Sequence, residues 1–392
     1  MSLPLGFRFA STYAGIRKRQ ADDLTFIVSD VEAAAAAVFT QNVVRAAPVT
    51  LTAEHLKKSK GRCRAIVANA GNANCATSTM GKVAKATAVA ASKLLGVPSH
   101  QILLASTGVI GEPLDPRKII DQLPDLHRRL SPDAFEGSAR AIMTTDTVPK
   151  VAFAELKTDS GTIRLAGMAK GSGMIHPRMA TMLSFLFTDA DIEAAPLQKI
   201  LRSIASRTFN CISVDSDTST NDTVYLLANG QSGVRVKSHH RAAFEAALRL
   251  IAEQLAVAIA RDGEGARKLL TIDVEGAAND SDAQHLARAI ANSPLVKTAL
   301  AGADPNWGRI LSSAGASGIR FDPAKVDIRL NGHLVCRRGC RANFSEEKVQ
   351  ASMEASECML HFRIGGSGKG KARFWTCDLT EGYIRINAEY RT

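Results

Sequence analysis

Threonine hydroxyls in three short segments are the best candidates for chemistry in this sequence. The segments are the apolar run MIHPRMATMLSFLFTDA (174–190), STGVIG (106–111) and MTTDT (143–147). Threonine is a poor nucleophile unless a base lies beside it, and one solution is an N-terminal threonine whose own α-amine is that base. Such amines titrate close to neutrality and can accept the hydroxyl proton. Cutting the chain between Ala180 and Thr181 would create this nucleophile, and the small Ala180 leaves the scissile carbonyl open to attack.

A simpler interpretation of the same run is a buried strand with one threonine whose hydroxyl is hydrogen-bonded. Continuous apolar runs of this length are typical of strands covered on both faces. The chain has no Gly-x-Ser-x-Gly elbow and no histidine placed to suggest a serine triad. The residues alone therefore leave both interpretations open.

Strands and helices that could position these hydroxyls alternate along the chain. Strands are predicted at 23–30, 63–69 and 101–106, and the last of them runs directly into STGVIG. Helices are predicted at 81–96, where Gly96 and Pro98 end the first one, and at 133–143, which leads into MTTDT. The clearest helix begins at Arg241 and stops at Asp262-Gly263, with apolar residues at steps of four and three. This mixture predicts an α/β fold.

A hairpin and two closing strands are predicted near the C-terminus. Asn331-Gly332 between two alternating segments indicates a hairpin over 325–337. The segments ARFWTCDL (372–379) and GYIRINAEY (382–390) are interpreted as closing strands. A shift in composition near residue 280 suggests a main domain over 1–280 and a smaller one over 281–392, since 392 residues exceed the usual size of a single core.

Composition indicates an ordinary globular protein. Hydrophobic residues make up 45% and charged residues 22% of the chain, and no apolar stretch is long enough to cross a bilayer. The N-terminus lacks the apolar core of a signal peptide, so we expect a cytoplasmic protein without a membrane partner. The net charge of +11 raises nucleic acid as a partner. The basic residues are dispersed and aromatic residues make up only 5%, so a solvated basic surface is the favoured interpretation.

Three segments resemble metal or phosphate motifs without completing them. The seven cysteines include one close pair, Cys336 and Cys340, whose spacing is not that of a zinc or redox motif, and free thiols are expected. GGSGKGKA (365–372) has Ala372 where a phosphate-binding loop needs Ser or Thr, and a basic hairpin tip is the better interpretation. DSDTSTND (215–222) starts like a calcium loop but lacks its glycine and its glutamate. No metal site is predicted.

The sequence as a whole resembles the ornithine acetyltransferase family, also called glutamate N-acetyltransferases. The segment KGSGMIHPRMATMLSFLFTDA (170–190) resembles the self-cleavage and nucleophile segment of that family. Eight further motifs occur in the order of the family: NAGNAN (69–74), ASTGVIG (105–111), AIMTTDT (141–147), TFNCISVDSDTSTNDT (208–223), DGEGA (262–266), NSPLVKTA (292–299), GADPNWGR (302–309) and CDLTEGYIRINAEY (377–390). Such collinear matches are far more specific than any one of them.

The resemblance implies roles for individual residues. Self-cleavage between Ala180 and Thr181 would make Thr181 the nucleophile, with an α chain of 1–180 and a β chain from 181. Thr107 and Gly108 would form the oxyanion hole. The substrate-binding residues implied by the family are Thr144, Lys170, Thr181, Glu264, Asn387 and Thr392. Lys170 suits the carboxylate of an N-acetylated amino acid, and Glu264 suits the ammonium of acetylornithine. Arg178 stands where the family often has a neutral or acidic residue. The resemblance leaves open how this cation affects the rate of self-cleavage.

The resemblance also implies the reaction and the architecture. Thr181 would take the acetyl group from N2-acetyl-L-ornithine and pass it to L-glutamate, in cyclic arginine biosynthesis and without a cofactor. The resemblance leaves open whether acetyl-CoA is a second donor. The expected fold is a layered α/β sandwich with a smaller C-terminal α/β domain, and the two chains would assemble as α2β2 or larger.

Three alternatives remain at this stage. An N-terminal-threonine amidohydrolase or aminopeptidase would share the nucleophile and use water as the acceptor. A related acetyltransferase of a specialised-metabolite pathway would carry the same motifs. A basic nucleic-acid-binding protein would show steeply salt-dependent binding and have no use for chain cleavage.

Overall fold

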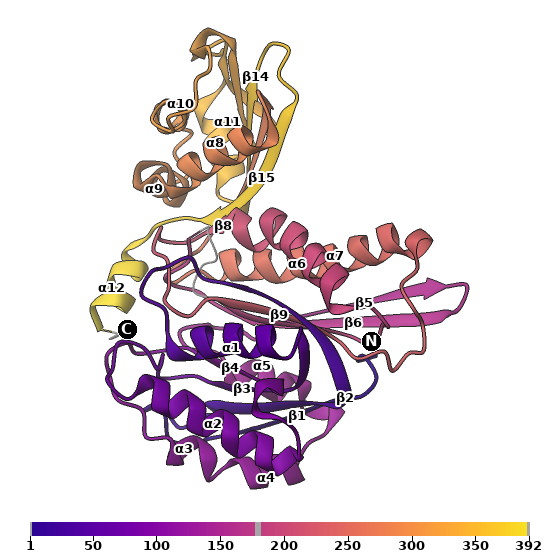
Figure 1. Cartoon of the computed structure of the whole chain (residues 1–392). Helices are drawn as coiled ribbons and strands as arrows, with labels where there is room; N and C mark the ends of the chain where they lie inside the picture. Colours follow the sequence, from indigo (N-terminus) through magenta and orange to yellow (C-terminus); the bar gives the residue numbers. More distant parts are fainter. Residues whose placement is uncertain (1, 177–181, 390–392) are drawn as a thin grey trace.

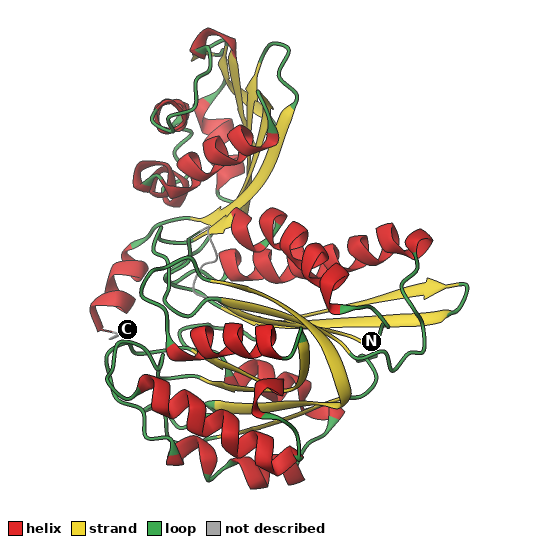
Figure 2. Cartoon of the chain, viewed as in Figure 1, coloured by secondary structure: helices red, strands yellow, loops and turns green. Residues whose placement is uncertain are grey.

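Two β-sheets form the framework of the protein. The structure is a computed structural model, and it describes residues 2–176 and 182–389. Figure 1 shows a large lower body that contains the first sheet and a smaller upper part built around the second. Helices and strands are mixed throughout, as Figure 2 shows, so the predicted α/β class is confirmed.

The first sheet has eight strands in the order β4-β3-β2-β9-β7-β6-β5, with β1 beside β2. Its strands are β1 (Phe7–Thr12), β2 (Leu24–Phe39), β3 (Arg62–Asn69), β4 (Ile102–Ser106), β5 (Lys150–Thr158), β6 (Gly161–Lys170), β7 (Leu183–Thr188) and β9 (Thr223–Ala228). The pairs β3–β4 and β7–β9 are parallel, and the other pairs are antiparallel. All six residues of β7 are buried, as expected for the apolar run after the Ala-Thr pair.

Seven helices cover this sheet: α1 (Ala47–Lys58), α2 (Met80–Leu95), α3 (Arg117–Ile120), α4 (Leu123–Arg128), α5 (Phe135–Ala141), α6 (Ala194–Arg207) and α7 (Arg241–Arg261). The helices α1 and α2 pack on β4, α6 packs on the alanine-rich half of β2, and α7 packs on β5 and β6. The predicted ends of two helices are confirmed. Gly96 caps α2 with a φ of 64°, and Asp262 caps α7.

The second sheet has seven strands in the order β13-β12-β11-β14-β10-β15-β8. Its strands are β8 (Ile212–Ser213), β10 (Leu269–Ala277), β11 (Val326–Leu330), β12 (His333–Arg337), β13 (Cys340–Arg341), β14 (Glu357–Ile364) and β15 (Gly370–Cys377). The helices of this part are α8 (Asp280–Asn292), α9 (Pro294–Ala301), α10 (Trp307–Gly315) and α11 (Glu346–Met353). Strand β10 belongs to this sheet although it precedes residue 280, and the division into two domains stays a prediction.

The hairpin predicted over 325–337 is present as β11 and β12. Asn331 and Gly332 both have positive φ angles, 46° and 86°, which a tight two-residue turn requires. The segment GGSGKGKA is not a hairpin tip, because β10 lies between the two strands that it connects, β14 and β15. All seven cysteines are free thiols, as expected.

The prediction of a closing strand over 382–390 was wrong for its described part. Residues Glu381–Glu389 form helix α12, which leaves the second sheet after β15 and lies beside the lower body in Figure 1. The helix places Tyr383 and Asn387, four residues apart, on one face, and both line the cavity described below. Ile384 of this helix is 69% exposed and is not buried in a sheet. None of the described helices is both long and apolar enough to span a membrane.

Candidate active site

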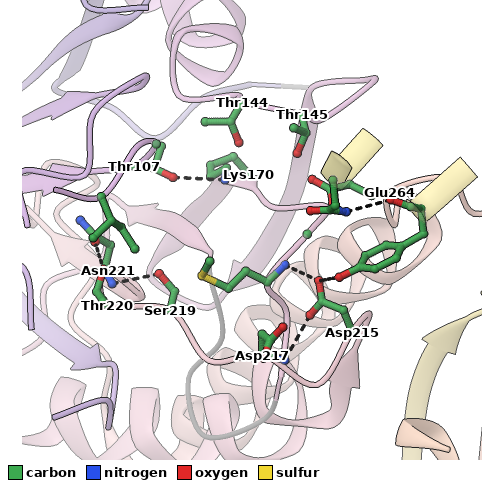
Figure 3. Close-up of a pocket in the computed structure, with 16 residues that line it drawn as sticks. Thr107, Thr144, Thr145, Lys170, Asp215, Asp217, Ser219, Thr220, Asn221 and Glu264 are labelled. Atoms are coloured by element: carbon green, nitrogen blue, oxygen red, sulfur yellow. Dashed lines mark hydrogen bonds between the residues drawn. The ribbon is translucent and has the colours of Figure 1, made fainter. Parts of the chain in front are cut away.

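A cavity of about 150 Å³ opens where the first sheet, the end of α7 and α12 meet (Figure 3). Its walls come from loops after β4, α5, β6, β8 and α7 and from one face of α12. Six of the residues singled out from the sequence line it: Thr107, Gly108, Thr144, Lys170, Glu264 and Asn387. The three others, Ala180, Thr181 and Thr392, lie outside the described residues. The fold therefore brings together motifs that are up to 280 residues apart in the chain.

Thr107 and Gly108 lie directly after the buried strand β4. The Thr107 amide donates to the carbonyl oxygen of Asn69 at 2.9 Å. Gly108 has a φ of +126°, and a side chain there would place its Cβ 2.3 Å from the carbonyl carbon of Gly71. Because that contact is with backbone, which cannot move aside, only glycine fits this position. The turn that exposes both residues to the cavity is thus fixed by close backbone packing.

Lys170 ends strand β6, and its side chain is almost fully buried. Its ammonium donates to the Thr107 hydroxyl oxygen at 3.3 Å. Because Thr107 accepts this bond, its own hydroxyl proton remains available for a bond to another acceptor. Burial lowers the pKa of Lys170, while the nearby carboxylates of Asp146, Glu264 and Asp222 oppose that effect. The Lys170 ammonium therefore lies beside the hydroxyl group that Thr107 can use as a donor.

A buried ion cluster behind the cavity was missed in the sequence. The ammonium of Lys150 lies 2.7 Å from Asp146 and 2.6 Å from Asp262, and the side chains are 1%, 0% and 9% exposed. Asp146 also accepts the backbone N–H groups of Thr144 and Gly171. Burial works to raise the pKa of Asp146, but Lys170 and Lys150 outweigh it and the pKa lies below its ordinary value. The cluster therefore connects the cavity loops after α5 and β6 to the end of α7.

Glu264 and Asn387 form the opposite wall. The Asn387 side chain donates to Oε2 of Glu264 at 2.8 Å, and the Glu264 amide donates to the carbonyl oxygen of Ser172 at 2.9 Å. A Cβ on Gly173 would lie 2.3 Å from the Glu264 carboxylate, so the glycine leaves room for that group. The Glu264 carboxylate lines the cavity beside this bond. Asn387 is aligned by α12, the helix that lies where a strand was expected.

Asp215 connects the cavity floor to α12. It accepts the N–H groups of Met174 and Ile175 at 2.5 and 2.9 Å, and the Tyr383 hydroxyl donates to it at 3.3 Å. Burial raises the pKa of Asp215 despite these bonds. The stretch that resembles a calcium loop thus holds the backbone leading to the Ala-Thr pair. Among the described residues, the one group with metal-ligand spacing is Asp159, His239 and His240, and none of these lines the cavity.

Comparisons with known proteins agree on one family over nearly the whole chain. The model of the ArgJ family matches residues 8–392. The arginine biosynthesis bifunctional protein ArgJ of Ruegeria pomeroyi is 46% identical over 389 residues, which cover 99% of this chain and 95% of that protein. The protein of the same name from Bradyrhizobium diazoefficiens is 44% identical over 401 residues, which cover 100% of this chain and 96% of that protein. This chain belongs to the ArgJ family.

The family resemblance inferred from the motifs is therefore confirmed. ArgJ proteins are ornithine acetyltransferases, or glutamate N-acetyltransferases, and this chain is accordingly an acyltransferase of arginine biosynthesis. A crystal structure of the arginine biosynthesis bifunctional protein ArgJ from Bacillus halodurans is similar, with 43% sequence identity and a TM-score of 0.52. The match covers 54% of this chain and 100% of the chain in that crystal structure. The roles of individual residues in this family member remain predictions.

Proposed function

We propose that this ArgJ family member moves the acetyl group of N2-acetyl-L-ornithine to L-glutamate through an acetyl ester on Thr181, after self-cleavage between Ala180 and Thr181. The observation that carries the proposal is the arrangement of charge in the cavity. Lys170 lies beside Thr107 at one side, and the Glu264 carboxylate lies at another. Acetylornithine carries a carboxylate and a distal ammonium, so the two ends of the substrate have partners of opposite charge.

In the first half-reaction, the α-amine of Thr181 takes the proton of its own hydroxyl, and the oxygen attacks the acetyl carbonyl carbon. The negative charge that develops on the carbonyl oxygen is stabilised by the Thr107 hydroxyl and the Gly108 N–H, and such donors act most strongly in the transition state. The carbon–nitrogen bond then breaks, and the α-ammonium gives its proton to the leaving amine of ornithine. The acetyl group is left on Thr181 as an ester.

The second half-reaction reverses this order with a new amine. The free amino group of L-glutamate attacks the ester, the same two donors stabilise the oxyanion, and the Thr181 oxygen takes back a proton as it leaves. No cofactor takes part in this exchange. Acetyl-CoA would enter as a thioester donor in place of acetylornithine, and assays with both donors decide whether this chain uses it.

Self-cleavage is supported by the proportions of the Bacillus halodurans relative. A β chain of residues 181–392 would contain 212 of the 392 residues, or 54%, and the chain in that crystal structure matches 54% of this one over its whole length. We further propose that the α and β chains stay together, assemble as α2β2 or larger, and work in the cytoplasm. Mass measurement under native conditions tests the assembly.

Two measurements test the proposal. The purified protein should separate under denaturing conditions into fragments of 180 and 212 residues, and the second should begin Thr-Met-Leu on N-terminal sequencing. Incubation with acetylornithine alone should place one acetyl group on the β chain, and addition of glutamate should remove it as N-acetylglutamate. A single uncut chain with full activity would refute the nucleophile. Release of acetate at the same rate without glutamate would identify an amidohydrolase instead.

A further inference from the structure

Self-cleavage poses a chemical problem that the later acetyl transfer does not have. Before the cut, the nitrogen of Thr181 is a peptide nitrogen, so it cannot serve as the base for the Thr181 hydroxyl. Another group must take that proton while the oxygen attacks the carbonyl carbon of Ala180. The proton then goes to the Thr181 nitrogen as the carbon–nitrogen bond breaks, which leaves an ester. Water splits the ester and restores the hydroxyl.

Asp222 is bonded to the backbone directly after the predicted nucleophile. The amide of Met182, the residue after Thr181, donates to Oδ1 of Asp222 at 3.1 Å. Thr223, which follows Asp222 in the chain, donates its backbone N–H to the carbonyl oxygen of Met182 at 3.0 Å. Strands β7 and β9 then continue in parallel from Leu183 and Thr223. One hydrogen bond therefore joins the carboxyl group to Met182, while the Thr223–Met182 backbone bond and the β7–β9 pairing hold the two segments side by side.

The second oxygen of this carboxyl group, Oδ2, is a buried atom without a hydrogen-bond partner among the described residues. Asp222 is fully buried, and Oδ2 makes no hydrogen bond of ordinary geometry to the described residues. Buried polar atoms are almost always hydrogen-bonded, so one that is not calls for an explanation. The hydroxyls of Thr40 and Ser219 are close enough to act on the carboxyl group, yet burial dominates and raises its pKa well above the ordinary value. A buried carboxylate of this kind accepts a proton more readily than an exposed one.

We infer that Asp222 is the base of the self-cleavage step and takes the proton of the Thr181 hydroxyl, an inference that rests on the proposed function. Oδ1 holds the chain through Met182, and Oδ2 is the oxygen that receives the proton. Lys170 is the nearby cation that acts on Asp222, and it stabilises the carboxylate form that the reaction needs. Once the cut is made, the α-amine of Thr181 takes over as base for acetyl transfer, and Asp222 keeps only its contact with Met182.

Asp222→Asn separates the two roles of this side chain. The amide oxygen of asparagine can still accept the Met182 N–H, but the group cannot take a proton. Freshly translated full-length chain is followed over time as it divides into fragments of 180 and 212 residues. We expect the D222N chain to be cut on the order of 10²–10⁴ times more slowly than the unchanged chain, the usual range for loss of a general base. Asp222→Glu should cut at least tenfold faster than D222N, because it keeps a carboxylate.

Hydroxylamine distinguishes the base of the first step from a role in splitting the ester. It cuts esters directly, so it should not speed cleavage in D222N if the ester never forms. Asp189→Asn is the matched control, because Asp189 is a fully buried carboxylate after β7 that accepts the amide of Arg164 at 2.8 Å. It should lower the melting temperature and leave the cleavage rate unchanged.

Three results would overturn the inference: D222N cutting within threefold of the unchanged chain, hydroxylamine restoring the cut in D222N, or equal rates for D222N and D222E. The Glu comparison and the Asp189→Asn control keep the test decisive if D222N folds poorly. A failure of the unchanged chain to cut between residues 180 and 181 would instead refute the proposed function, so the two failures are distinct.

Discussion

Replacing Lys150 by methionine tests whether the buried ion cluster holds the cavity together. The substitution removes the cation that lies 2.7 Å from Asp146 and 2.6 Å from Asp262. Asp262 loses its counter-charge in the cluster, and Asp146 keeps only that of Lys170. Removing one partner of a buried ion pair typically lowers the free energy of unfolding by about 3–5 kcal/mol. With an unfolding entropy of about 2.1 cal/mol/K per residue, this corresponds to a fall of roughly 4–6 °C in melting temperature.

The same substitution should weaken substrate binding. Asp146 holds the amides of Thr144 and Gly171, and a carboxylate that loses its cation draws in water or a proton and releases them. We therefore expect K150M to raise KM for acetylornithine more than it lowers kcat, measured by steady-state kinetics alongside thermal unfolding. Adding Asp262→Asn to K150M removes one of the two carboxylates and should regain part of the lost stability.

Arg241→Met is the control, because Arg241 and Glu245 form an exposed pair on α7. Exposed pairs contribute at most about 1 kcal/mol, so its melting temperature should hardly change. If K150M lost no more stability than this control, the cluster would not be the connection between the loops that the geometry suggests.

Three further predictions follow from the cavity. Thr107→Ala should lower kcat on the order of 10²–10³ with a smaller change in KM, while Thr107→Ser keeps a donor and most of the rate; a loss of stability with normal kcat would remove Thr107 from the mechanism. Glu264→Gln should raise KM for acetylornithine on the order of 10–100-fold and leave KM for glutamate nearly unchanged, because the loss of a charged hydrogen bond affects only the substrate with the distal ammonium. Because the pKa of Asp146 is lowered from 3.8, its carboxylate adds stability above that pH and the contribution is lost as the pH falls through the folded-state pKa; acid unfolding monitored by circular dichroism should therefore be steeper for the unchanged chain than for Asp146→Asn.

Local signals in the sequence predicted much of the main body. The apolar run of β7, the caps of α2 and α7, and the Asn331-Gly332 turn depend on a few neighbouring residues, and the structure contains all of them. Residues 382–390 were predicted as a strand, and their described part forms helix α12 instead. Its conformation is decided by contacts with Asp215 and Glu264, more than 100 residues away, which no local pattern can reveal.

The residues around the cavity were also predicted only in part from the sequence. Family motifs pointed to Thr107, Gly108, Thr144, Lys170, Glu264 and Asn387, and the fold brings these six to one place. The motifs could not single out Lys150, because a lysine at the start of a strand gives no sign that two buried carboxylates surround it. Asp215 and Asp222 belong to an incomplete calcium loop and to a family motif, and neither pattern assigned them a role. Their hydrogen bonds to Met174, Ile175 and Met182 place one on each side of the predicted cleavage segment.

Two glycines explain how the end of the chain reaches the active site. A Cβ on Gly265 would lie 2.3 Å from the backbone nitrogen of Tyr383 and 2.5 Å from the carbonyl carbon of Gly382, so the loop after α7 and the start of α12 touch backbone to backbone. The Thr380 hydroxyl donates to the carbonyl oxygen of Gly265 and fastens the same contact. Because Glu264 lies next to Gly265 and Asn387 lies one turn beyond Tyr383, this contact fixes the distance between the two side chains. The DGEGA and EGY segments therefore need glycine for close approach, and a side chain at Gly265 would separate Asn387 from Glu264 and open this wall of the cavity.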